Sequence, residues 1–259
     1  MSRTGAGANS SDFFTQVAKG AVAGSSIIRK FGHNDDVSTA FEHVWDAGGT
    51  YAGWLTTAAA VRVKAGGNAA DDQDGGANAR SVTVTGLDES WAMVSETINT
   101  EGADVGTAST TTFIRVFRAF VATVGTYGNT NAAAITIETA AAVVMAQISA
   151  GKGQTQMALF TVPAGKTGYL LAVSIEHDSA RTIDFRMFRR EGADDTTAPM
   201  PGLRLVSEFD GLGESSFVRN YPSLPSFPAK TDIITQVLAD AGGTAAVSVE
   251  FDLLLVDDD

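Results

Sequence analysis

The stretch Gln154–Glu176 constrains the fold most, because two apolar runs there flank the turn sequence Pro163-Ala164-Gly165. Proline fixes φ near the value that the second residue of a type I turn needs, and glycine supplies the left-handed residue that returns the chain to a ladder. Apart from Lys166, no charged residue interrupts either run before Glu176. The sequence therefore predicts a β-hairpin at the centre of an all-β core.

The sequence Gly165-Lys166-Thr167 inside this stretch resembles the end of a phosphate-binding P-loop. That motif also requires a glycine five residues before the second glycine and a helix after it. Phe160 occupies the position of that first glycine, and strand-like sequence follows Thr167. We therefore expect no nucleotide here and no cofactor elsewhere.

The composition of the chain argues against several classes of binding partner. The 259-residue chain has 18 Lys and Arg against 30 Asp and Glu, a net charge of −12, and no Cys. Nucleic-acid binding depends on cations that meet phosphates, so we expect no nucleic-acid partner. The longest apolar-leaning run, Ala132–Ile148, is short and interrupted by polar residues, so we expect no membrane association. Met1–Ser11 lacks the apolar stretch of a signal peptide.

Strand signals recur at short intervals between glycine-rich turns. In the last of these segments, Ala245–Val256, Val247, Val249 and Phe251 alternate with polar residues. Period-2 alternation without long helical periodicity is typical of an antiparallel β-sandwich or a jelly roll. We predict an N-terminal arm and linker over residues 1–50, followed by a β-sandwich module over 51–259, either undivided or in two halves, 51–150 and 151–259.

Two segments carry apolar residues that they cannot bury by themselves. Residues 13–19 could form a short helix capped by Asp12 and stopped by Gly20, or an extended arm. Residues 221–228 contain three prolines and cannot sit in a ladder. We therefore predict a partner interface made of Phe13, Phe14, Val17, Ile27, Phe31, Tyr221, Pro222, Pro225, Phe227 and Pro228.

Candidate catalytic and metal residues are few. The sequence contains no nucleophile elbow and no zinc-protease motif, so we predict no catalytic residues and no enzymatic activity. His33 and His43 do not have a recognised ligand spacing, and a solvated loop is the alternative to a metal site. Asp72 and Asp74 do not fit the frame of an EF-hand, although loose Ca²⁺ binding stays open.

We expect Arg115 and Arg118 to reach a sheet edge or an interface, because a buried arginine needs a partner.

Several runs in order along the chain resemble virion structural proteins of tailed bacteriophages, particularly phages of aquatic bacteria. The likeness extends from the N-terminus through the central hairpin. It is carried by the runs Asp12-Phe13-Phe14, Val44-Trp45-Asp46-Ala47-Gly48-Gly49, Ala79-Arg80-Ser81-Val82-Thr83-Val84-Thr85-Gly86-Leu87-Asp88, Phe113-Ile114-Arg115-Val116-Phe117-Arg118-Ala119 and Thr161-Val162-Pro163-Ala164-Gly165-Lys166-Thr167-Gly168-Tyr169-Leu170. The resemblance implies a non-enzymatic component of a particle.

Three functional hypotheses remain. In the first, the chain is a capsid decoration or cement protein that binds the major capsid protein or other virion proteins on the head exterior. It would be a homotrimer, and the virion would be assembled in the bacterial cytoplasm. In the second, it is a neck, tail or fibre-base protein. In the third, it is a carbohydrate-binding β-sandwich, whose sugar platforms would be Trp45, Trp54, Trp91 and Tyr221.

Overall fold

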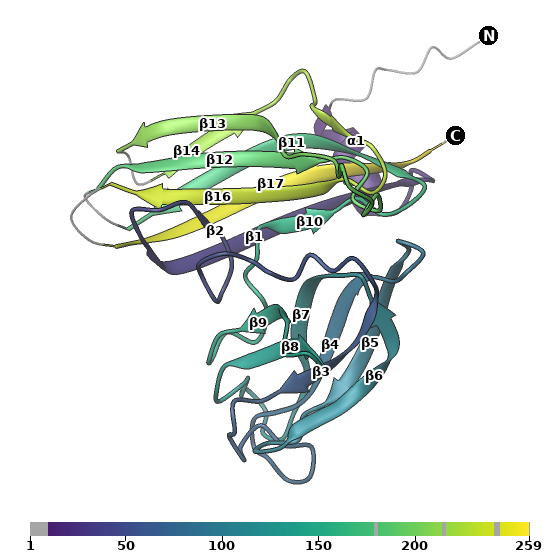
Figure 1. Ribbon diagram of the computed structural model, residues 1–259, viewed down its shortest axis with the longest axis vertical. Coiled ribbons are helices and arrows are strands. Elements are labelled where there is room, and N and C mark those ends of the chain that lie inside the picture. Colours follow the sequence, from purple (N-terminus) through teal and green to yellow (C-terminus); the bar gives the residue numbers. More distant parts are fainter. Residues whose placement is uncertain (1–9, 179–180, 214–215, 241–243, 259) are drawn as a thin grey trace.

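The computed structural model describes residues 10–178, 181–213, 216–240 and 244–258. These residues form two antiparallel β-sandwiches that lie one above the other along the long axis of the molecule (Figure 1). The prediction of an all-β antiparallel sandwich fold is confirmed. Among the described residues the single α-helix is α1 (Ser10–Ala18), and no described helix is long and apolar enough to cross a membrane.

We call the upper body the terminal sandwich, because it contains the first and last strands. Its first sheet has the order β1 (Ser25–Val37), β17 (Ala245–Asp257), β11 (Lys166–His177) and β14 (Ser216–Asn220), with β15 (Ser226–Phe227) also on β11. Its second sheet has the order β10 (Leu159–Thr161), β16 (Asp232–Ala239), β12 (Ile183–Arg190) and β13 (Arg204–Leu212), with β2 (Glu42–His43) also on β16.

The lower body lies entirely in the connection between β2 and β10, and we call it the inserted sandwich (Figure 1). One of its sheets has the order β6 (Val105–Phe113), β3 (Ala59–Lys64), β8 (Ile135–Thr139) and β9 (Val144–Ile148). The other has the order β5 (Met93–Asn99), β4 (Ala79–Leu87) and β7 (Arg115–Val124). β6 and β7 are separated by Ile114 alone.

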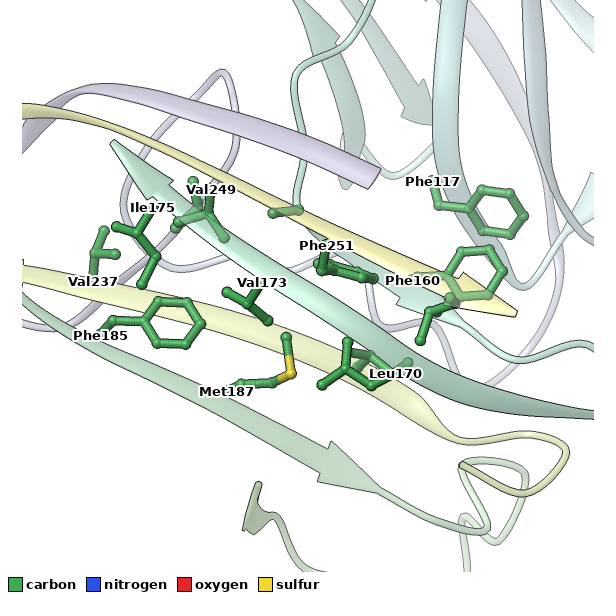
Figure 2. Close-up of a cluster of buried hydrophobic side chains, with 14 of the residues drawn as sticks. Phe117, Phe160, Leu170, Val173, Ile175, Phe185, Met187, Val237, Val249 and Phe251 are labelled. Carbon is green, nitrogen blue, oxygen red and sulfur yellow. The ribbon is translucent and has the colours of Figure 1, made fainter. Parts of the chain in front are cut away.

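Alternation along the strands builds the core of the terminal sandwich. On β17, Val247, Val249 and Phe251 are at most 1% exposed and point between the sheets. Phe185 and Met187 of β12 face them from the second sheet (Figure 2). Fully burying one such side chain stabilises the folded state by about 1.5–3 kcal/mol, so this interior is a main source of stability.

The central hairpin predicted around Pro163 is wrong. Gly165 does adopt a left-handed φ of 70°, but the turn carries the chain from one sheet to the other. β10 pairs with β16, whereas β11 pairs with β17, so the two strands share no ladder. Proline has no N–H to give to a partner strand, and the neighbouring Val162 donates its N–H to the carbonyl of Thr231 at 3.0 Å.

The prediction of an arm and linker over residues 1–50 is wrong for Ser25–Val37. These residues form β1, which is hydrogen-bonded to β17 in a long antiparallel register that places Ile28 opposite Leu253. The strand lacks a simple alternation of apolar and polar residues because it is an edge strand with one face toward the inserted sandwich. The alternation of apolar and polar residues in the sequence therefore did not reveal that β1 belongs to the sheet.

A buried charge network joins the two sandwiches. Arg115 of β7 donates from Nε to Asp232 Oδ1 of β16 at 2.9 Å and from Nη2 to Oδ2 at 3.2 Å, and Asp232 is fully buried. Thr161 Oγ1 donates to the same carboxylate at 2.6 Å, and Arg190 donates to it from Nε at 3.0 Å. The guanidinium of Arg115 also lies 4.9 Å from the ring of Trp91. Arg115 is thus paired and lies at an interface, as a buried arginine requires.

Apolar contacts reinforce this junction. Phe117 of β7 packs against Phe160 of β10 with ring centroids 4.8 Å apart, and both side chains are buried (Figure 2). Tyr51 lies in the connection from β2 and donates its hydroxyl to the carbonyl of Met145 at 2.9 Å. Each of the two hydrophobic core clusters therefore contains residues from both sandwiches.

The segment Asp71-Asp72-Gln73-Asp74, the acidic loop of the inserted sandwich, has a structural role at Asp71. Its fully buried carboxylate accepts hydrogen bonds from the backbone N–H groups of Ala79 at 3.0 Å, Ala132 at 2.8 Å and Ala133 at 2.9 Å. Three donors from two separate segments satisfy the carboxylate oxygens and fix both segments to one point. Asp71 thus replaces the backbone partners that these N–H groups lack.

Candidate interaction surface

Helix α1 covers part of the outer face of the terminal sandwich, where it contacts β1. The helix ends at Ala18, and Gly20 follows with a left-handed φ of 71° and donates its N–H to the carbonyl of Val17 at 2.9 Å. Val17 is buried, whereas Phe13 is 37% exposed. Phe13 and Phe14 form an edge-to-face pair with centroids 5.5 Å apart. The helix thus presents an aromatic pair beside the sheet.

A groove of about 870 Å³ runs between α1, the outer face of the first sheet and the chain after β14. We call it the helix groove; its apolar lining is made by Phe14, Ile27, Leu171, Tyr221, Pro222 and Leu224. The floor comes from the first sheet, with Ile27 on β1 and Leu171 on β11. Leu224 is 40% exposed, so apolar surface here remains in contact with water.

Charged side chains border the helix groove on one side. Arg29 lines it and forms an ion pair with Glu250, and the hydrogen bond and the charge of Glu250 raise the pKa of the guanidinium further. Asp252 lies opposite Arg29 in the β1–β17 register and also lines the groove. Burial raises the pKa of the Asp252 carboxyl, although Arg29 opposes that change. This edge of the groove therefore presents one cation between two carboxylates.

The proline-rich segment is held in place by its backbone. Tyr221 donates its N–H to the carbonyl of Leu171 at 2.9 Å, and its hydroxyl hydrogen-bonds Ser207 Oγ at 2.6 Å. Pro225 accepts from the N–H of Leu170 at 2.9 Å. The expectation that this segment stays out of any ladder is wrong for β15, since Phe227 pairs with Gly168. The segment is an ordered wall of the groove.

The structure brings Phe14, Ile27, Tyr221 and Pro222 of the predicted interface residues together in the helix groove, with Phe13 exposed beside it. The interface role of these residues stays a prediction. Val17 and Phe227 are 3% and 0% exposed, so the prediction that they contact a partner is wrong: their side chains pack inside their own chain.

The remaining predicted residues lie elsewhere. Phe31 lines a crevice on the side of β1 that faces the inserted sandwich, Pro225 is half-buried, and Pro228 is exposed. Sequence reasoning missed Leu171 and Leu224. Leu171 lies at the β-bulge between Leu170 and Ala172, where alternation no longer tells which side chain points outward.

The aromatic residues suggested as sugar platforms are mostly covered. Trp45 and Trp91 are 5% and 6% exposed, so the prediction that they form a sugar-binding surface is wrong. Trp54 is half-buried beneath the guanidinium of Arg115 at 5.3 Å. Tyr221 has the guanidinium of Arg219 5.9 Å from its ring centroid. An arginine thus lies over one face of Trp54 and over one face of Tyr221.

The two histidines of the polar cluster have separate partners. His33 contacts Ser248 Oγ through Nδ1 at 2.9 Å, whereas His43 accepts the N–H of Tyr51 at its Nδ1 at 3.0 Å. Burial lowers the pKa of His43. Within the described ranges, no group of three or more potential metal-ligating side chains comes together, the acidic loop at Asp72 and Asp74 included.

Comparison with known proteins gives no family. No protein-family model and no curated protein matches the chain. The chain is similar, at 10% identity and a TM-score of 0.27, to the structure of the infectious bursal disease virus Gt strain, covering 90% of this chain and 72% of that one. It is similar to infectious bursal virus derived T=1 particles at 9% identity and a TM-score of 0.24, covering 94% of this chain and 79% of that one.

A third solved structure contains the cysteine protease and lectin-like domains of Cwp84, a surface layer associated protein of Clostridium difficile. The identity is 11% and the TM-score 0.22, and the match covers 74% of this chain and 53% of that one. TM-scores this low do not indicate a shared fold. The fold assignment therefore rests on the sheets described above, and the function on the surface of this chain.

Proposed function

We propose that this chain is a non-enzymatic structural component of a virus particle, of the tailed-phage kind that its sequence resembles. Its specific role would be decoration of the head exterior, in contact with the major capsid protein or other virion proteins. The observation that carries the proposal is the helix groove, which gathers Phe14, Ile27, Tyr221 and Pro222 from segments far apart in the sequence.

The groove supports adhesion because it combines a wide apolar floor with exposed apolar rims. Phe13 is 37% exposed and Leu224 is 40% exposed, so an approaching subunit would remove apolar surface from water on both sides of the groove. A gain of about 25 cal/mol per Å² of such area favours association. Binding to an assembled shell would also stabilise the folded chain by mass action.

A non-catalytic role is supported by the structural contacts that the buried polar groups make. Arg115 and Asp232 join the two sandwiches, and Asp71 caps backbone N–H groups. These side chains are saturated with partners inside the chain, so they are not poised to transfer a proton or attack a substrate. Self-association into a trimer is part of the same proposal, since closed symmetry is the common arrangement of such subunits.

The position on the particle is tested by locating and counting the chain. Immunogold labelling of purified particles, with copy number from quantitative mass spectrometry, should show label over the head and on the order of hundreds of copies. A dozen copies or fewer, with label at the neck or tail, would instead support the neck, tail or fibre-base alternative. Absence of the chain from washed particles would refute the structural role itself.

The groove is tested by placing charge on its rims. The double variant Phe14→Glu/Leu224→Glu should fold as the wild type does and lose binding to particles that lack the protein, because two carboxylates cannot be buried without partners. Tyr127→Glu is the matched control, since Tyr127 is fully exposed on the inserted sandwich. Full occupancy by the double variant would show that another surface makes the contact.

A further inference from the structure

A second cavity, of about 540 Å³, lies on the other side of β1, between this edge strand and the inserted sandwich. We call it the junction crevice. Its volume falls in the range of about 300–1,000 Å³ typical of small-molecule sites, which occur preferentially between domains. Ile28 and Phe31 line it from β1, Phe117 and Phe120 from β7, and Phe160 from β10. The crevice is therefore bounded by both sandwiches.

Its walls are mainly apolar. Phe117 and Phe160 are 6% and 1% exposed and form the inner part, with their rings in contact (Figure 2). Met93 of β5 also lines the crevice and is 44% exposed, which places its side chain at the mouth. Together these side chains form a passage from solvent to an aromatic interior, suited to an apolar body of modest length.

Three cations line the same crevice: Lys30, Arg118 and Arg29, of which Arg29 is paired with Glu250. Lys30 is 7% exposed, and its ammonium donates to the carbonyl of Phe117. Arg118 is exposed, stacks on Phe120 at 5.5 Å and donates from Nη2 to Gln154 Oε1 at 3.3 Å. In the part of the chain that the structure describes, neither Lys30 nor Arg118 forms an ion pair. None of the described residues that line the crevice is Asp or Glu.

This arrangement is unusual in a chain with a net charge of −12. Burial, and then repulsion from Arg118, lower the pKa of Lys30 to about 7. The third cation of the lining, Arg29, lies one residue before Lys30 on β1 and forms an ion pair with Glu250. Lys30 and Arg118 thus have no ion-pair partner among the described residues and lie against apolar walls, where an anion would complete them.

We propose that the junction crevice binds a small amphipathic anion, an alkyl carboxylate of the fatty-acid type. Its head group lies between Lys30 and Arg118, and its chain lies along Phe31, Phe120 and Met93. A carboxylate accepts charge-assisted hydrogen bonds from both cations, while the alkyl body fills the apolar passage. The inference is independent of the structural role proposed above, because Lys30 and Arg118 do not line the helix groove; the two cavities share only Ile27 and Arg29 of their lining.

The test is calorimetric titration of the full chain with decanoate at about pH 8, below the concentration at which decanoate forms micelles. At this pH Lys30 is largely neutral, so an arriving anion raises its pKa and the complex takes up a proton. Titrations in buffers of different ionisation enthalpy should therefore show uptake approaching one proton. Decanol, which has no charge, should bind at least about tenfold more weakly and without proton uptake.

Variants locate the head group. Lys30→Met keeps an apolar side chain of similar length, and should weaken decanoate binding about tenfold or more and abolish proton uptake while decanol binding stays unchanged. Lys166→Met is the matched control, because Lys166 pairs with Asp257 away from the crevice. Equal binding of decanoate and decanol, or no effect of Lys30→Met, would overturn the proposal.

A second readout places the alkyl chain without any substitution. In protein labelled at the methionine methyl groups, decanoate should shift the NMR signal of Met93 and leave that of Met200, which is exposed on another surface. A shift at Met200 alone would mean adhesion to exposed apolar surface. The absence of both heat and a Met93 shift at millimolar decanoate would also overturn the inference.

Discussion

Replacing Arg115 by Met should separate the two sandwiches energetically. The substitution keeps much of the apolar stem but removes both donors to Asp232, which is fully buried. It also leaves the carbonyls of Leu55 and Ile114 without the Nη1 donor that now lies 2.7 and 2.8 Å away. Breaking a buried ion pair by removing one partner destabilises a protein by about 3–5 kcal/mol.

The loss should fall in this range although Arg190 and Thr161 still donate to Asp232. The stacking of Arg115 on Trp54 and Trp91 is lost as well, and such contacts contribute about 0.5–2 kcal/mol. For a chain of this size each kcal/mol lowers the Tm by about 2–4 °C, so the expected decrease is roughly 6–20 °C.

Urea unfolding followed with two probes distinguishes loss of the junction from general weakening. Trp54 and Trp91 flank Arg115, so tryptophan fluorescence reports on the junction, whereas far-UV circular dichroism reports on all strands. In the variant the fluorescence transition should precede the dichroism transition. Lys166→Met, which removes a partly exposed ion pair, is the control and should change stability by less than about 1 kcal/mol. If Arg115→Met were no more destabilising than this control, the network would not hold the sandwiches together.

Three further predictions concern single positions. Lys30 has a pKa of about 7 in the folded protein and 10.5 in the reference state, so unfolding takes up a proton at pH values between the two. The free energy of unfolding of the wild type should therefore rise with pH across this window, by at most about 5 kcal/mol. In urea titrations at several pH values, Lys30→Met should remove this rise. Gly86→Ala should be strongly destabilising in thermal melts, because its Cβ would lie 1.9 Å from a backbone oxygen of β7, whereas Gly202→Ala, with open space around it, should be close to neutral. Asp71→Asn should cost about 1–3 kcal/mol, because an amide NH₂ would face backbone donors; a loss no larger than that of the exposed Asp74→Asn would contradict the capping role.

The sequence predicted local conformation better than pairing. The alternation around Phe251 correctly identified the inward face of the last strand, and Gly165 is left-handed as the turn required. Turn chemistry, however, does not determine whether the two flanking strands share a ladder. The turn at Pro163 connects two sheets, and the partners of its strands, β16 and β17, lie more than fifty residues further along the chain.

The candidate surface was predicted in part for a similar reason. An apolar residue in a proline-rich segment can face a partner or its own core, and the sequence pattern is the same in both cases. Tyr221 lines the groove, whereas Phe227 is fully buried in the core cluster, although the backbone of each is bonded to β11. Lys30 gave no signal at all, since its burial depends on the inserted sandwich packing against β1.

The pairing of β1 with β17 has a consequence for synthesis. Ser25 lies opposite Val256, so the first strand leaves the ribosome long before its neighbour exists. The inserted sandwich contains its own strand partners within residues 59–148 and can form during translation. Contacts of such high sequence separation close slowly, so the nascent chain carries an unpaired edge until its last strand emerges, and chaperone demand should be greatest at that stage.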